Sequence, residues 1–288
     1  MSGFQSILVP VADAGASAPL DAALRLAMGQ GGHVIGLHVR VDPSMAVPLV
    51  GEGMSGAMVE EMMAAAEKQA AVRAAAARQL FDQGVARAGL RVAAAPPVEG
   101  ASAEWLDVTG REEEVVAGRG RLSDLVVLGR LSADNETPSP MTLNAALMES
   151  GRPLLLVPPA ASETIGRNVV IAWNGSAEAG RAVAAALPLL TRADRVTILS
   201  VSEDERLANA PAGELAAYLA WHGIAAGCHR LPGNATHAGE ALAGECMTLG
   251  ADLLVLGAYT HSRLRQLILG GVTRHVLHHT PLACLMCH

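Results

Sequence analysis

Residues 251–288, ADLLVLGAYTHSRLRQLILGGVTRHVLHHTPLACLMCH, decide the fold of this chain. The apolar run DLLVL is a strand that ends at Gly257, and the pair Gly270-Gly271 opens a helical segment. A strand that leads into a loop beside a helix N-terminus can hold an anion through backbone N–H groups, without a basic side chain. The stretch therefore predicts a phosphate-binding corner in an α/β domain.

An internal repeat divides the chain near its middle. SDLVVLGR (123–130) and RPLLLVPP (152–159) repeat ADLLVLGAY and TPLACLMCH, and ILVPVADAGAS near the start repeats VVIAWNGSAEAGRAV after residue 168. Asp124 and Asp252 are 128 positions apart, whereas Ile7 and Val169 are 162 apart, a difference of 34. We therefore predict two domains, 1–159 and 168–288, joined through a linker at 158–168, with a long helical insertion in the first.

Composition excludes several classes of function. The chain has 288 residues, of which 51% are hydrophobic and only 2% aromatic, with a net charge of -7. An acidic chain with few aromatic side chains is a poor partner for nucleic acid. The start, MSGFQSILVP, lacks a secretory pattern, and no segment holds 18 uninterrupted apolar residues. We expect a cytoplasmic protein without a membrane partner, whose four cysteines are reduced.

Hydrophobic patterning predicts alternating strands and helices. In the first half we expect strands at 7–11, 33–41, 90–95, 125–128 and 154–157, and helices from Ser17 and at 57–88, 105–118 and 143–150. Ser55 and Gly89 are the expected ends of the long helix. In the second half we expect strands near 168–173, 196–201, 225–230, 252–256 and 282–286. Such alternation indicates parallel sheets with right-handed crossovers.

These motifs resemble the universal stress protein family in its tandem form. The resemblance rests on the two opening turns, ILVPVADAGAS and VVIAWNGSAEAGRAV, on DLVVLGR and DLLVLGAY, and on GAYTHSRLRQLILGGVTRHVLHHTPLACLM. It implies two flavodoxin-like or Rossmann-like domains, each a mainly parallel five-stranded sheet of order 3-2-1-4-5 flanked by helices. It also implies intrachain pairing of the domains through their fifth strands, and it allows a homodimer and protein partners that the sequence does not identify.

The resemblance also implies a nucleotide site in the second domain. Nucleotide-binding members carry Gly, two residues, Gly, nine residues, Gly and then Ser or Thr. Gly257 and Gly270 match this pattern, but Thr260 and Gly271 depart from it, and Asn174 stands where the family has Asp. We expect a weakened site for ATP or another adenine nucleotide, with Mg²⁺. The residues implied are Asn174, Val201, Gly257, Thr260, Ser262, Gly270, Gly271, Val272 and Thr273.

The first domain departs further from the family pattern. Gly129 is followed by Arg130-Leu131-Ser132, and no glycine pair opens the helix after Pro138 and Pro140, so we expect no phosphate site there. Asp13 is interpreted as a turn residue that caps the helix near Ser17.

Three other motifs favour structural interpretations. GEGMSG (51–56) has the letters of a dinucleotide fingerprint, but Pro43 and Pro48 separate it from the preceding strand, so we interpret it as a loop. In CLMCH, Cys284 and Cys287 lie three apart on a strand and face opposite ways, which favours packed thiols over haem attachment, redox or zinc chemistry. His275 and His279 have metal-ligand spacing without a nearby acidic third ligand.

No catalytic arrangement can be assembled from the sequence. It offers no Ser-His-Asp set, Walker lysine or paired carboxylates in a fitting structural context. We therefore expect a non-enzymatic stress-response protein. The alternatives are a structural or signalling scaffold without nucleotide and a weak ATPase.

Overall fold

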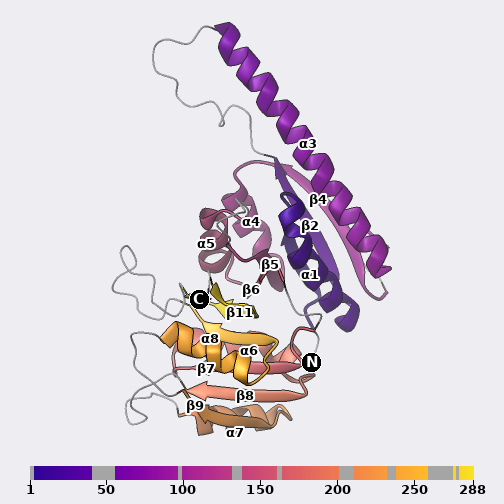
Figure 1. Ribbon diagram of the computed structural model, residues 1–288. Helices are drawn as coiled ribbons and strands as arrows, with labels where there is room; N and C mark the ends of the chain where they lie inside the picture. Colours follow the sequence, from indigo (N-terminus) through magenta and orange to yellow (C-terminus); the bar gives the residue numbers. More distant parts are fainter. Residues whose placement is uncertain are drawn as a thin grey trace.

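A computed structural model describes residues 3–40, 56–96, 99–131, 138–160, 164–200, 211–231, 238–258, 275–276 and 279–288. These residues form a mixed α/β protein with a mostly parallel sheet and flanking helices, which confirms the predicted fold class (Figure 1). Within them, no helix has the length and apolar character that a membrane span requires.

The described residues form one continuous sheet of 11 strands, in the order β3-β4-β2-β1-β5-β6-β11-β10-β7-β8-β9. The first half supplies β1 (Ser6–Pro10), β2 (His33–Arg40), β3 (Arg91–Val92), β4 (Ser102–Thr109), β5 (Leu125–Gly129) and β6 (Leu154–Val157). The second half supplies β7 (Asn168–Trp173), β8 (Arg195–Ser200), β9 (Ala226–Arg230), β10 (Leu253–Gly257) and β11 (Ala283–Cys287). In each half the first strand lies centrally: β1 pairs with β2 and β5, and β7 pairs with β8 and β10.

Helices cover both faces of the sheet. One face packs against α1 (Ser17–Gln30), α3 (Gly56–Ala88), α6 (Ala177–Leu190) and α7 (Ala212–Trp221). The other packs against α4 (Glu112–Gly120), α5 (Pro140–Glu149) and α8 (Ala238–Thr248). Successive strand residues serve opposite cores, since Ile7 and Val9 join the first and Leu8 joins the second. Strands buried on both faces explain the nearly continuous apolar runs of the sequence.

The two halves meet through an antiparallel strand pair. β6 and β11 pair with Leu155 opposite Leu285, whereas the other neighbouring strands among the described residues are parallel. A side-chain hydrogen bond adds to this junction, because Arg130 Nη1 donates to the carbonyl oxygen of Thr280 at 2.6 Å. A second such bond links the halves elsewhere, since Arg192 Nη1 donates to the carbonyl oxygen of Gly29 at 2.5 Å. The two halves are therefore joined by backbone hydrogen bonds, buried leucines and two arginines.

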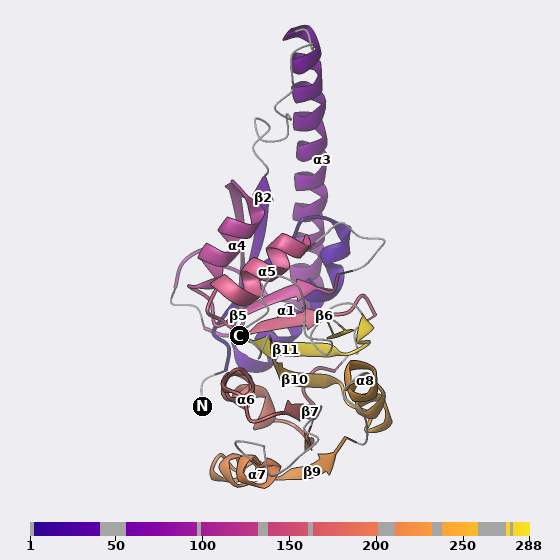
Figure 2. The same ribbon diagram turned by 90° about the vertical axis from the view of Figure 1, so that its left-hand side faces the viewer.

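The first half contains the long helix α3, which lies in the segment predicted to hold an insertion and extends well beyond the sheet (Figures 1 and 2). Its C-terminal part packs on the body through the buried Ala77, Phe81 and Val85. Gly89, which has φ of 64°, ends the helix as the sequence predicts. The expected N-cap, Ser55, and the loop at 51–55 lie outside the described residues.

The segment between α3 and β5 corrects two predictions. The helix expected at 105–118 is wrong over its first half, because β4 covers Ser102–Thr109, and it is confirmed from Glu112, where α4 begins. The strand expected at 90–95 is reduced to Arg91–Val92 and lies outside β4 instead of beside β2. The reason is tertiary: β4 pairs with β2 in register from His33 to Arg40, which satisfies the backbone groups of both strands.

Candidate functional site

The structure brings two of the predicted site residues, Asn174 and Gly257, to the same edge of the sheet. Asn174 follows β7 directly and Gly257 is the last residue of β10, and these strands are parallel neighbours. The carboxyl ends of parallel strands form the usual ligand-binding edge of an α/β sheet. The remaining predicted residues, Val201, Thr260, Ser262, Gly270, Gly271, Val272 and Thr273, lie outside the described residues.

Asn174 holds the turn between β7 and α6. Its Oδ1 accepts a hydrogen bond from the backbone N–H of Ser176 at 3.1 Å, and Gly175 has φ of 72°. Ser176 then caps α6, because its Oγ accepts from the N–H of Ala179 at 3.1 Å. The Asn174 side chain thus stabilises the turn before α6, at the position where the family motif has Asp.

Gly257 is required by packing. A Cβ at this position would lie 2.5 Å from the backbone nitrogen of Ala179 and 2.8 Å from Cβ of Glu178. The first turn of α6 therefore lies directly against the end of β10. This contact explains a glycine here without a ligand, and it also places the positive end of the α6 dipole beside Gly257.

Charges next to this edge are paired among themselves. Arg181 of α6 donates to Glu178 Oε1 at 3.0 Å and to the backbone oxygen of His288 at 3.0 Å. The Glu178 side chain keeps only 19% of its exposure, whereas that of Arg181 keeps 51%. The Arg181 guanidinium is thus accessible from solvent at this edge. An anion bound there would compete with Glu178 for the guanidinium.

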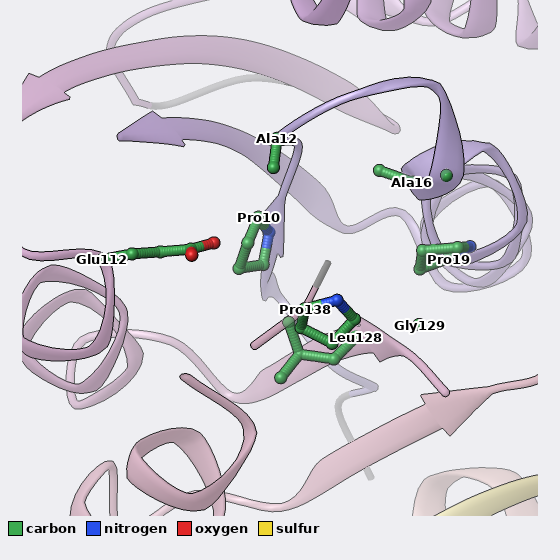
Figure 3. A pocket seen from close by; sticks show the side chains of 9 residues that line it. Pro10, Ala12, Ala16, Pro19, Glu112, Leu128, Gly129 and Pro138 are labelled. Carbon is green, nitrogen blue, oxygen red and sulfur yellow. The ribbon is translucent and has the colours of Figure 1, made fainter. Parts of the chain in front are cut away.

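The first half contains a small cavity at the carboxyl ends of β1 and β5. It measures about 20 Å³ and is walled by the ends of β1 and β5, the start of α1, Glu112 and Pro138. Figure 3 shows Glu112 extending from the start of α4 toward Pro10. A cavity of this volume holds about one water molecule, which is far less than a nucleotide needs.

Glu112 sets the electrostatics of this cavity. Burial raises the pKa of its carboxyl, and the hydrogen bond from Thr142 Oγ1 to Glu112 Oε2, at 3.2 Å, acts in the opposite direction. A carboxylate in the wall disfavours an anion. Sequence reasoning placed Glu112 inside a helix but did not single it out, since three successive acids in a first helical turn are ordinary dipole partners.

Asp13 is a turn residue in the structure. Its Oδ1 accepts from the N–H of Gly15 at 2.7 Å and so stabilises the 3₁₀ turn η1 (Ala14–Ala16). The cap of α1 itself is Ala16, without a side-chain hydrogen bond. Asp13 and Asn174 therefore make the same contact, with the N–H two residues ahead, in the two halves of the repeat.

The cysteines are packed thiols in three of four positions. Cys284 and Cys287 lie in the cores on opposite faces of the sheet, as strand geometry predicts. Burial raises the pKa of Cys246 and Cys287 to about 12, and it raises the pKa of Cys284 as well. Cys228 alone of the four is exposed. Deprotonation of the buried thiols, which redox and zinc chemistry both require, is therefore disfavoured.

The histidine pair gives no metal site among the described residues. The rings of His275 and His279 are 5.2 Å apart between centroids. Within the described part of the chain, no group of three or more His, Cys, Asp or Glu side chains is placed to hold a metal ion. The two histidines therefore form a ring contact on the segment before β11.

Comparison with known proteins supports the family resemblance. The family model described as "Universal stress protein family" matches residues 234–288, and no curated protein matches the chain. A universal stress protein from Archaeoglobus fulgidus DSM 4304 superposes with a TM-score of 0.66 at 15% identity, covering 99% of this chain and 98% of that one. A putative universal stress protein from Pseudomonas aeruginosa UCBPP-PA14 gives 0.56 at 14%, covering 99% and 94%. The functionally unknown protein PA1789 from Pseudomonas aeruginosa PAO1 gives 0.55 at 14%, covering 99% and 93%.

The resemblance found in the sequence is thus confirmed for the C-terminal segment by the family model. The fold of the whole chain, over the full length of these structures, is that of universal stress proteins.

Proposed function

We propose that this chain is a tandem universal stress protein, with domains 1–159 and 168–288, that acts without catalysis and binds an adenine nucleotide weakly in its second domain. The matched segment 234–288 contains the entire predicted phosphate loop. The observation that carries the proposal is the position of Asn174 and Gly257 at the carboxyl ends of neighbouring strands, beside the N-terminus of α6. ATP with Mg²⁺ is the expected ligand.

The geometry also supports the weakness of the site. Asn174 Oδ1 is engaged by Ser176, and Asn lacks the charge that a carboxylate would offer to ribose hydroxyls or to the adenine amino group. The first turn of α6 occupies the space beside Gly257, so Gly257 itself leaves little room for a phosphate. We expect a dissociation constant for ATP of about 0.1 to 1 mM, or roughly −4 to −5.5 kcal/mol.

The test uses Asn174→Asp. A carboxylate can keep the hydrogen bond to the Ser176 N–H with one oxygen and offer the other to the ligand, so the turn survives. Charge-assisted hydrogen bonds are stronger, and we expect ATP affinity to rise about fivefold. Titration calorimetry with ATP, ADP and AMP in the presence of Mg²⁺ measures this change.

The matched control is Asp13→Asn in the first half, where the same turn contact exists but no nucleotide site is expected. It should leave ATP binding unchanged. Absence of any binding to the unaltered protein at millimolar nucleotide would refute the nucleotide proposal.

A scaffold function without nucleotide is the second candidate, and the tight packing of Gly257 favours it. It predicts that Asn174→Asp and Asn174→Ala differ only in thermal stability. It also predicts no shift of the unfolding temperature with any of the three nucleotides.

A further inference from the structure

The 11-stranded sheet has two outer strands that differ sharply in protection. β3 has only two residues, one of them Arg91. β9 has five residues, four of them exposed, with Arg230 at its end and no proline. In the described part of the chain, β8 is the only strand that pairs with β9. Natural sheets usually shield an edge with short strands, proline or charges. The outer edge of β9 has one charged residue, so its backbone groups are available to a partner strand.

The peptide groups at the centre of this edge point outward. The N–H of Leu231 donates to the carbonyl oxygen of Ser200 at 3.2 Å, which fixes the phase of the β8–β9 ladder. Because backbone groups alternate along a strand, Gly227 and His229 bond toward β8, whereas the N–H and C=O of Cys228 point away from it. Cys228 is therefore the central residue of the available edge.

An aromatic stripe lies at the same end of the molecule. α7 packs on β8 and β9 through the buried Leu215 and Leu219, which leaves Tyr218 and Trp221 on its outer face. Trp221 is 90% exposed and Tyr218 is 42% exposed, in a chain where aromatic residues are only 2%. Figures 1 and 2 show α7 and β9 together at the end of the molecule opposite α3. Exposed aromatic side chains beside an open edge are typical of an interaction surface.

We propose that β9 pairs antiparallel with β9 of a second copy of this chain, around a twofold axis at Cys228. Two identical edges that hydrogen-bond across a twofold axis are antiparallel, because a parallel ladder needs an offset that a twofold axis does not allow. They bring together the same residues from both copies. In this register Cys228 faces Cys228 of the second copy as a hydrogen-bonded pair, with Cα atoms about 5.5 Å apart. The sheet then continues from one copy into the next.

The side chains of β9 suit self-pairing. With Cys228 on the axis, Ala226 lies opposite Arg230 of the second copy, and Gly227 lies opposite His229. Each large or charged side chain thus faces a small one, and no like charges oppose each other directly. His229 also keeps its contact with Glu245 of α8, at 3.1 Å, on the face away from α7.

The chain already uses this mode of association once. β6 and β11, the corresponding edge strands of its two halves, pair antiparallel within one molecule. The proposed contact repeats that mode at the β9 edge, and the twofold axis places α7 of each copy on the same face of the joined sheet. Tyr218 and Trp221 of the two copies are then available to cover each other. Two five-residue strands and one face of α7 from each copy make a small interface. It lies near about 1,200 Å² of total buried surface, the lower limit for stable protein–protein interfaces, so the dimer should dissociate on dilution.

The first test is sedimentation equilibrium of the full chain across a concentration series. We expect a reversible monomer–dimer equilibrium for the unaltered protein. Cys228→Pro removes the outward N–H without removing a bond to β8, and proline is tolerated at such edge positions. It should weaken dimerisation at least tenfold. Cys228→Ser keeps the N–H and should dimerise like the unaltered chain, so the pair of variants separates the backbone contact from the thiol.

The second test uses the unaltered chain and does not depend on the folding of a variant. Copper–phenanthroline oxidises two facing thiols, each losing one electron and one proton, as the S–S bond forms. We expect a cross-linked dimer through Cys228. In a Cys228→Ser background, Arg230→Cys should give no such product, because position 230 faces position 226 of the second copy.

Three outcomes would overturn the proposal. A chain that stays monomeric up to several hundred micromolar has no such contact. A dimer that persists undiminished in folded Cys228→Pro uses another surface. Equal cross-linking through positions 228 and 230 rejects the register. None of these outcomes depends on nucleotide binding, so the function proposed above stands or falls separately.

Discussion

The carboxylate of Asp252 accepts a hydrogen bond from the backbone N–H of Gly166 at 3.0 Å. It also accepts from the N–H groups of Arg167 and Asn168, so one side chain organises the entry into β7. Asp124 makes the corresponding contact in the first half, with the N–H groups of Gln5 at 2.8 Å and Ser6 at 3.1 Å. Both halves of the repeat therefore share a hydrogen-bonded contact. It joins the segment before β1 or β7 to the turn before β5 or β10.

Substitution of Asp252 by Asn should destabilise the protein by about 1 to 3 kcal/mol, because a buried acceptor of several N–H bonds loses its charge. Asp124→Asn is the matched control. It should destabilise the protein less, since Asp124 accepts from only two N–H groups and lies at a more exposed position. Urea unfolding followed by circular dichroism measures both. A larger loss for Asp124→Asn than for Asp252→Asn would contradict the argument.

A methyl group at the two corresponding glycines should have unequal effects. Gly257→Ala places Cβ 2.5 Å from the backbone nitrogen of Ala179, which cannot move without displacing α6, so we expect a loss of about 1 to 3 kcal/mol. At Gly129 the nearest atom is Cδ of Pro138, at 3.7 Å, so Gly129→Ala should be nearly neutral. Thermal unfolding distinguishes the two variants. Equal stability of both would mean that α6 does not press on β10.

Glu112 should give the stability a pH dependence. Its folded pKa is raised by burial, so the folded state holds this proton more tightly than the unfolded state. The stabilisation that comes from protonated Glu112 is fully present below the ordinary glutamate pKa. It is lost as pH rises through the raised pKa of the folded state. Glu112→Gln, which can still accept from Thr142 Oγ1, should therefore be more stable than the unaltered protein at neutral pH and flatten the profile in that window.

The control for this prediction is Glu113→Gln, at a neighbouring acid that is paired with Arg111 at 2.8 Å. The pKa of Glu112 also depends on the charges of Glu113, His38 and Asp13. The dependence of unfolding free energy on pH should therefore be measured for Glu112→Gln and Glu113→Gln separately. The prediction is wrong if Glu112→Gln and the unaltered protein have the same free energy of unfolding at every pH from acid to neutral. Burial of this carboxyl would then not affect stability.

The four thiols should differ in reactivity. Cys228 is exposed, whereas Cys246, Cys284 and Cys287 are buried with raised pKa values. Ellman's reagent should therefore titrate one thiol in the native protein and four after denaturation. Cys228→Ser should abolish the native reaction. Rapid reaction of a second thiol would show that one of the cores opens easily.

The interval 89–120 shows why patterning failed in one place. Trp105, Leu106 and Val108 fit a helical face as well as a strand, because acidic residues interrupt them. Pairing with β2 decided the outcome: eight residues of β4 lie opposite His33–Arg40, and Trp105 packs against Phe81 of α3 with ring centroids 5.2 Å apart. Neither partner is local in the sequence, so local periodicity could not reveal the strand.

The candidate site divides in the same way. The prediction of a phosphate loop rests on the spacing of Gly257 and Gly270 within a repeated strand pattern. The contact between Gly257 and α6 was not, because it joins segments about 80 positions apart. Likewise, the carboxylate wall of the first-half cavity depends on how α4 starts beside β1, and nothing in the run of three acids at 112–114 marks it.

By itself, the sequence determined the alternation of strands and helices, the repeat and the family resemblance, because these follow from local periodicity, glycine placement and motif spacing. Tertiary structure decided which backbone edge each strand uses. It assigned β4 to β2, joined β6 to β11, and left Cys228 at the end of the sheet. The physical reason is that hydrogen bonds between strands and the burial of glycine or carboxylate groups depend on neighbours that are distant in the chain.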